Sequence, residues 1–312
     1  MKGFIGNVVL VACLCYLSLG QAQDGSNEHL CPADDDHKVL KGREMREENN
    51  PSLAMICFEE ALKHNPKDTA AMLAISELHL SMANFVGAEA KLTELLHIDN
   101  DHAEALYLMA DVYRIRHEFG MHGNQGRREK TTKMVGDVVH FYRRALEVNP
   151  EDDITYASLG SYYLSLGDFE NAVLTFQDGL QIKPDSNPIL LGLADTYKHK
   201  EEYETCLHWA QRALLQDKKL AHTYAIIGEC ALFSNQPERA VNALEKACLL
   251  ETGEHHFLHL LITAVRSNVS MRAADALTVL KKIDLVNYHD EDILSMFHEL
   301  MTELSERMDR EL

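Results

Sequence analysis

Glycine, proline and tryptophan are scarce in this sequence of 312 residues, which contains 16 glycines, 7 prolines and one tryptophan. Collagen-like chains and turn-rich all-β folds need glycine and proline far more often, so both classes are disfavoured. Hydrophobic residues make up 46% of the chain, which is enough to bury a core and excludes intrinsic disorder over most of its length. The composition therefore favours a helical protein.

Basic residues are also few, because 30 Lys and Arg stand against 49 Asp and Glu and the formal net charge is −19. Nucleic-acid affinity comes largely from clustered Lys and Arg that displace counterions from phosphates. We therefore expect no nucleic-acid partner. Basic or neutral protein segments suit this charge better.

Catalytic and metal-binding motifs are missing: there is no G-x-S-x-G, no P-loop and no glycine-rich dinucleotide fingerprint. His255 and His259 are four residues apart, so one helix face could present both to zinc. Two histidines make an incomplete site, and no HExxH or Cys-x-x-Cys accompanies them. We expect a protein that is not an enzyme, with no cofactor and no metal.

The amino terminus has the features of a secretory signal peptide over residues 1–22. Lys2 precedes an apolar run from Phe4 to Leu19, and the small residues Gly20 and Ala22 suit a signal peptidase. The run is short for a membrane-spanning helix, although an uncleaved anchor is the alternative. An acidic linker over 23–34 would follow. The predicted location is secreted or the lumen of the endoplasmic reticulum, with no stable membrane insertion after cleavage. A cytoplasmic or ciliary location is the alternative.

Five cysteines lie outside the predicted signal: Cys31, Cys57, Cys206, Cys230 and Cys248. Five is odd, so at least one thiol cannot pair within the chain. Scattered cysteines in a helical protein are usually small buried hydrophobes. In an oxidising lumen a bond between Cys206 and Cys230 is the alternative.

A single acceptable sequon for N-linked glycosylation is present, Asn268-Val-Ser270. At the carboxyl terminus the chain ends Asp309-Arg310-Glu311-Leu312, which shares only its last two residues with a lumenal retention signal. Both features are compatible with a secretory protein, and neither identifies one by itself.

Internal repetition is clearest in residues 153–186. The first half places one set of residues on a helix face, at i, i+3, i+4 and i+7: Tyr156, Leu159, Gly160 and Tyr163. After a break at Gly167-Asp168, a second face carries Ala172, Phe176, Gly179 and Leu180, and the helix ends before Pro184. The pattern predicts two short helices joined by a tight turn. Small residues at Gly160 and Ala172 would let the two helices approach closely.

These residues resemble the tetratricopeptide (TPR) family, which has a 34-residue motif. Residues 153–186 match this motif except where Gly179 replaces an alanine. Steps of 34 residues predict about seven units: 35–68, 69–102, 103–152 with an insertion at 120–135, 153–186, 187–220, 221–254 and a degenerate 255–288. Residues 289–312 follow as an amphipathic capping helix; a swapped or dimeric use of this helix is the alternative. The resemblance implies an all-α fold, a right-handed α-α superhelical solenoid of helical hairpins.

The resemblance also implies a concave groove lined by the second, fifth, ninth, twelfth and thirteenth residues of each unit. Carried over here, the ninth positions are Glu77, Asp111, Ser161, Asp195 and Glu229, so four acids in five places would line one wall. Such a ladder would favour an extended basic segment. Tyr107 and Leu191, at fifth positions, would supply apolar floor. The alternative is that these acids are ordinary solvated charges.

The insertion 120–135 runs against the global charge, with Arg127, Arg128, Lys130 and Lys133 against one glutamate. Its glycines predict a mobile loop, either a docking arm or processing site or simply a tolerated insertion.

Taken together, the repeat, the groove and the absence of catalytic motifs predict a non-catalytic protein–protein interaction scaffold that binds a basic or apolar extended peptide, such as a co-chaperone-like adaptor of the secretory pathway. A regulatory subunit of a lumenal enzyme is the alternative.

Overall fold

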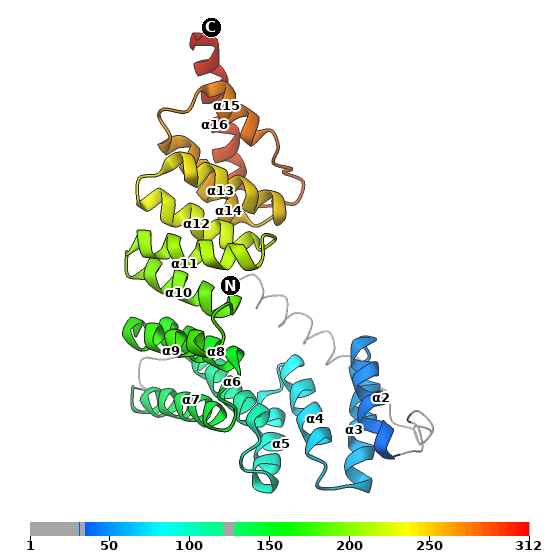
Figure 1. Cartoon of the computed structure of the whole chain (residues 1–312). Helices are drawn as coiled ribbons and strands as arrows, with labels where there is room; N and C mark the ends of the chain where they lie inside the picture. Colours follow the sequence, from blue (N-terminus) through cyan, green and yellow to red (C-terminus); the bar gives the residue numbers. More distant parts are fainter. Residues whose placement is uncertain (1–30, 32–34, 121–127, 312) are drawn as a thin grey trace. The chain divides into compact units, whose positions relative to one another are not determined.

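The structure is a computed structural model that describes Cys31 and residues 35–120 and 128–311. The described residues form helices and no strands (Figure 1). The chain divides into two compact units, residues 1–150 and 151–312. The helices of the first unit are α2 (Asp35–Glu47), α3 (Pro51–His64), α4 (Thr69–Ser81), α5 (Phe85–Ile98), α6 (Ala103–Gly120) and α7 (Arg128–Val148).

The second unit continues the same alternation of helices. Its helices are α8 (Asp153–Ser165), α9 (Phe169–Ile182), α10 (Asn187–His199), α11 (Tyr203–Gln216), α12 (Ala221–Phe233), α13 (Pro237–Leu250), α14 (His255–Ser267), α15 (Ala273–Leu280) and α16 (Glu291–Glu311). Within each unit, consecutive helices pack as antiparallel hairpins and each hairpin packs on the next. The expected all-α class of repeated helical hairpins is confirmed.

The hairpin α8–α9 shows how capping residues and a glycine turn determine where the helices begin and end. Asp152 caps α8 by accepting a hydrogen bond from the Ile154 amide at 3.2 Å, and Asp168 caps α9 through the Asn171 amide at 3.2 Å. Between the helices Gly167 has a φ of +75°, a conformation that glycine adopts without strain. The predicted break at Gly167-Asp168 is therefore the turn.

Gly160 and Gly192 leave the space in the core that the Phe176 ring occupies. Each of these glycines lies on the first helix of a repeat. A Cβ atom at Gly160 would lie 2.5 Å from Phe176 Cε1, and a Cβ at Gly192 on α10 would meet the same ring. Phe176 is fully buried. The close approach predicted for Gly160 and Ala172 thus has a specific cause, since the glycines leave the space that an aromatic side chain of the second helix fills.

The insertion lengthens a hairpin, which corrects part of the sequence prediction. The helix α6 has 18 residues where other first helices have 13, and α7 has 21 where most second helices have 14. Residues 128–135, expected as loop, belong to α7 because no residue there breaks a helix. Residues 121–127 lie outside the described part of the chain, and so do the predicted signal peptide and the linker apart from Cys31.

The last hairpin is short and is covered by α16, where the sequence predicts a capping helix. The helix α15 has only 8 residues, and α16 packs against α14 and α15. Phe297, Leu300 and Leu304 of α16 are buried in the core of the second unit. No described helix combines the length and the apolar character that crossing a membrane requires.

Two disulfide bonds are present among the described cysteines. Cys206 on α11 is bonded to Cys230 on α12, with Cα atoms 6.6 Å apart, and Cys31 is bonded to Cys57 on α3, with Cα atoms 5.6 Å apart. Cys248 is buried and free. The interpretation of all five as isolated buried thiols is therefore wrong for four of them, because folding brings cysteines 24 and 26 residues apart into bonding distance.

Candidate partner-binding face

The structure places the six predicted binding residues on first helices, three in each unit. Glu77 lies on α4, and Tyr107 and Asp111 lie on α6; Leu191 and Asp195 lie on α10, and Glu229 lies on α12. We use the name first-helix row for the ninth and twelfth residues of the repeats. The row includes Arg46, Glu77, Asp111, Arg114, Asp195, Lys198, Glu229 and Leu232.

In the second unit one lysine joins two of the predicted acids. The Nζ atom of Lys198 lies 2.8 Å from Asp195 on the same helix and 3.1 Å from Glu229 on α12. All three side chains are between 18% and 23% exposed, so solvent screens these ion pairs only in part. The structure therefore brings Asp195 and Glu229 together, but through a shared cation.

The pKa of Lys198 reflects this arrangement. Burial alone would lower it, but the charges and hydrogen bonds of Asp195 and Glu229 outweigh burial and raise the pKa above its ordinary value. Lys198 therefore stays protonated at neutral pH. Two carboxylates share one positive charge, which leaves this part of the first-helix row with a net charge of about −1.

In the first unit each predicted acid has its own arginine. Glu77 pairs with Arg46 of α2, on the neighbouring hairpin. Asp111 lies 2.9 Å from Arg114 and also accepts a 2.6 Å hydrogen bond from the Tyr142 hydroxyl of α7. These acids are therefore neutralised within the fold.

Burial and charge also shift the pKa values around Asp111. Burial alone would lower the pKa of Arg114, but Asp111 outweighs it and raises that pKa above its ordinary value. Burial, followed by the charge of Asp111, raises the pKa of Tyr142. The Tyr107 ring lies 5.8 Å from the Tyr142 ring, centroid to centroid. This cluster ties α6 to α7 and has a structural role.

All four predicted acids are therefore ion-paired within the fold, and their role in binding stays a prediction. The sequence already contained the basic partners of these acids, at the twelfth position of the repeats. These positions are basic in the first, third, fifth and seventh repeats and leucine in the three between: Arg46, Leu80, Arg114, Leu164, Lys198, Leu232 and Arg266. Position twelve lies one turn after position nine, so a base there reaches the acid of its own repeat or of the next.

Apolar side chains lie on α10 and α12, the two helices that the shared lysine joins. Leu191 is partly buried and packs against the core of the second unit, as does Leu232. Phe233, the next residue of α12, is 61% exposed, and its ring stacks on Tyr203 at 5.2 Å between centroids. Aromatic residues are enriched at protein-binding surfaces, and Phe233 follows Glu229 by four residues on α12.

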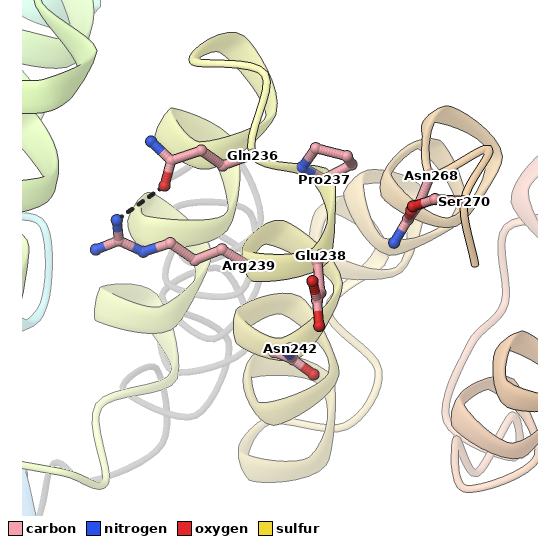
Figure 2. Close-up of a pocket in the computed structure, with 7 residues that line it drawn as sticks. All are labelled: Gln236, Pro237, Glu238, Arg239, Asn242, Asn268 and Ser270. Carbon is pink, nitrogen blue, oxygen red and sulfur yellow. Dashed lines mark hydrogen bonds between the residues drawn. The ribbon is translucent and has the colours of Figure 1, made fainter.

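The predicted glycosylation site lies beside a pocket of about 490 Å³ at the start of α13 (Figure 2). Asn268 is only 5% exposed, and its Oδ1 accepts a 2.9 Å hydrogen bond from the Ser270 hydroxyl. Across the pocket, Arg239 donates a 3.0 Å hydrogen bond to Gln236 (Figure 2). The side chain of Asn268 thus borders an open space, and its glycosylation stays a prediction.

Metal ligation finds no support in the described part of the chain. No group of three or more His, Cys, Asp or Glu side chains there has the geometry to hold an ion. His255, one half of the pair considered above, packs its ring against Tyr288 at 5.7 Å between centroids.

Comparison with known proteins agrees with the fold. Sequence profiles described as tetratricopeptide repeat match residues 45–112 and 155–186. Tetratricopeptide repeat protein 37 of Xenopus laevis is 24% identical over 204 residues, which cover 63% of this chain but only 12% of that protein. The chain thus spans a small part of that relative.

Solved structures show the same architecture at low sequence identity. A TPR protein of Thermus thermophilus aligns with a TM-score of 0.52 and 19% identity, covering 64% of this chain and all of that one. PilW, a type IV pilus biogenesis factor, aligns with a TM-score of 0.61 and 17% identity, covering 74% of this chain and all of PilW. The fold defines an α-helical repeat protein built from successive helical hairpins. Residues 45–112 and 155–186 of this chain therefore match tetratricopeptide repeats, in agreement with the resemblance found in the sequence.

Proposed function

We propose that this protein is a non-catalytic scaffold that binds an extended segment of a partner protein along the first-helix row of its second unit. One observation carries the proposal: Asp195 and Glu229 share the single cation of Lys198. A repeat array suits such a role because it presents the same helix face at regular intervals.

The chemistry favours a partner segment that carries Lys or Arg beside a large apolar residue. An incoming cation can take one of the two carboxylates while Lys198 keeps the other, so each carboxylate then has a cation of its own and the excess negative charge is neutralised. The exposed Phe233 ring and the partly buried Leu232 offer apolar contact beside it. In the first unit Glu77 and Asp111 each have an arginine already, so they favour a basic segment less.

Peptide titration tests this function. Fluorescent peptides with an Arg-Leu or Lys-Leu core would be titrated into the full protein at two salt concentrations, with Gln-Leu peptides as the neutral reference. The double variant Asp195→Asn/Glu229→Gln should weaken binding about tenfold and flatten its salt dependence. The matched control Glu251→Gln/Glu306→Gln removes the same charge from exposed positions outside the row and should bind within about twofold of the wild type.

Equal affinity of the two double variants would contradict the proposal, and so would equal binding of neutral and basic peptides. Thermal unfolding of each variant checks that the fold is intact, since Asn and Gln keep the hydrogen-bonding shape of the acids they replace.

We also propose that the protein works in an oxidising compartment, as a secreted protein or in the endoplasmic reticulum lumen. Disulfides persist in such compartments and are rare in the cytosol, and the bonds Cys31–Cys57 and Cys206–Cys230 support this location. Intact-mass analysis of protein purified from its native source tests it. The expected mass is that of a chain without the predicted signal peptide and without two pairs of thiol hydrogens. A full-length chain with all thiols reduced would overturn the proposal.

A further inference from the structure

A cavity of about 630 Å³ lies between the second helices α11 and α13 and the start of α12. Four of its lining residues are basic: His208, Arg212, Lys218 and Lys246. None of the described residues that line it is acidic. In a chain whose net charge is −19, this is a local reversal of sign. We call this cavity the cationic pocket.

Helix geometry explains how the pocket forms. His208, Arg212 and Leu215 follow the i, i+4, i+7 spacing of one face of α11, while Cys206, Ala210 and other residues of the opposite face are buried in the core. Lys218 lies two residues after the end of α11, and Lys246 comes from the corresponding face of α13. Because Arg212 and Lys246 occupy the same position in two successive repeats, the repeat itself places two cations on adjacent second helices.

Aromatic rings position two of these cations. The Arg212 guanidinium lies 5.0 Å from the ring centre of Trp209, and its Nη2 donates a 3.1 Å hydrogen bond to the Pro184 carbonyl. The Lys246 ammonium lies 5.4 Å from the ring centre of Tyr224. A cation held over a ring keeps its charge and most of its N–H donors, so it stays available to an anion.

Neither Lys218 nor Lys246 has an ion pair with any described carboxylate, and both are exposed. The basic residues of the first-helix row differ in this respect, because Arg46, Arg114, Lys198 and Arg266 each form an ion pair with a carboxylate. Beside the cations, Leu215 is 75% exposed, and Leu214 also lines the cavity. The pocket therefore combines uncompensated positive charge with an apolar edge.

We propose that the cationic pocket is a second docking site, which binds a carboxylate-rich segment of a partner protein that carries a large apolar residue among its acids. Charge complementarity selects the carboxylates, and Leu214 with Leu215 receives the apolar residue. A nucleic acid is disfavoured as the occupant, since the net negative charge of the chain repels a long phosphate backbone. This site is separate from the first-helix row and takes a ligand of opposite charge.

Fluorescence anisotropy on the full protein tests the proposal with three synthetic peptides. The first carries several glutamates around one leucine, the second has glutamine at every glutamate, and the third has serine in place of the leucine. We expect the first peptide to bind at least about tenfold more tightly than either of the others. Its affinity should fall steeply with added salt.

The variant Lys218→Gln/Lys246→Gln should weaken binding of the glutamate peptide about tenfold or more. Both side chains are exposed, so the fold should be unaffected. The matched control Lys63→Gln/Lys281→Gln makes the same change in net charge at exposed positions away from the pocket and should leave the affinity within about twofold. The variant Asp195→Asn/Glu229→Gln should bind the glutamate peptide as the wild type does, which separates this test from that of the first-helix row.

Three results would overturn the proposal: equal affinity for the glutamine peptide, equal loss of binding in the pocket and control variants, or equal affinity for the serine peptide. The last result would mean that the pocket attracts any anion. Competition by inorganic phosphate, as strong as competition by the glutamate peptide itself, would overturn the proposal for the same reason.

Discussion

Lys198 on α10 donates a 3.1 Å hydrogen bond to Glu229 on α12, in the next repeat. Arg46 and Glu77 occupy the same two repeat positions in the first unit and pair in the same way. The shared geometry follows from a repeat in which a base at position twelve faces the acid at position nine of the following repeat. These links hold successive hairpins to one another by charge as well as by apolar packing.

Removing the shared cation should destabilise the second unit. In Lys198→Met, Asp195 and Glu229 would lie near each other with no base between them, so we expect a loss of about 1–3 kcal/mol in the free energy of unfolding. Urea denaturation followed by circular dichroism measures it. In the comparison variant Arg272→Met, the ion pair with Asp275 is exposed, and the loss should be below about 0.5 kcal/mol. Similar losses in both variants would show that the shared lysine is no more important than a surface pair.

Two glycine-to-alanine substitutions should act in opposite directions. Gly160→Ala places a methyl group 2.5 Å from the Phe176 ring, so overpacking should cost about 1–3 kcal/mol despite the better helix propensity of alanine. Gly136→Ala on α7 meets nothing within 4 Å and should stabilise by about 0.5–1 kcal/mol. Thermal unfolding of both variants checks the signs. Stabilisation by Gly160→Ala would mean that Phe176 moves aside freely.

The free thiol of Cys248 should be inert in the folded protein. Burial raises its pKa to about 12. At pH 8 we therefore expect no alkylation by iodoacetamide in native buffer and complete alkylation in guanidinium, read by mass spectrometry. A Ser295→Cys variant supplies an exposed thiol on α16 as the positive control. Native alkylation of Cys248 at the rate of the control would contradict the structure.

Asp153 should give the second unit an acid-sensitive part of its stability. Burial acts to raise the pKa of Asp153, but hydrogen bonds from Ser186 at 2.5 Å and Lys183 at 2.9 Å outweigh it, so the pKa lies below its ordinary value of about 4. A lowered folded pKa stabilises the protein above the unfolded pKa, and this stability is lost as the pH falls through the folded value.

The variant Asp153→Asn provides the measurement. The stability difference between the wild type and Asp153→Asn should be full at pH 6 and should shrink progressively below about pH 4. Chemical denaturation at a series of pH values follows it, with Asp217→Asn as a control acid in the same unit. A difference that stays constant down to pH 2 would contradict the assigned hydrogen bonds.

Most of the fold could be predicted because its signals are local. The first helices begin at Thr69, Ala103, Asp153, Asn187 and Ala221, each at the first residue of an expected unit. Each hairpin is determined by a helix period, a cap and a turn that lie within one repeat. The greater length of α6 and α7 was not predicted, because the glycines of the insertion favour a loop.

The candidate site was predicted less completely. The acids at positions nine were identified, but their charge compensation depends on bases at positions twelve of the same and neighbouring repeats. The cationic pocket was not predicted, because its members come from three helices and the turn after α11, and only Arg212 and Lys246 share a repeat position.

The sequence by itself determined the repeat, the helix faces and the acidic balance, because these depend on residues close together in the chain. Only the tertiary structure decided which charges meet: it paired Asp195 and Glu229 with Lys198 and left Lys218 and Lys246 without a described carboxylate. It also brought Cys206 to Cys230 and Cys31 to Cys57. The physical reason is that electrostatic and covalent pairing depends on distances of a few ångströms between side chains of different helices, and helix packing sets those distances.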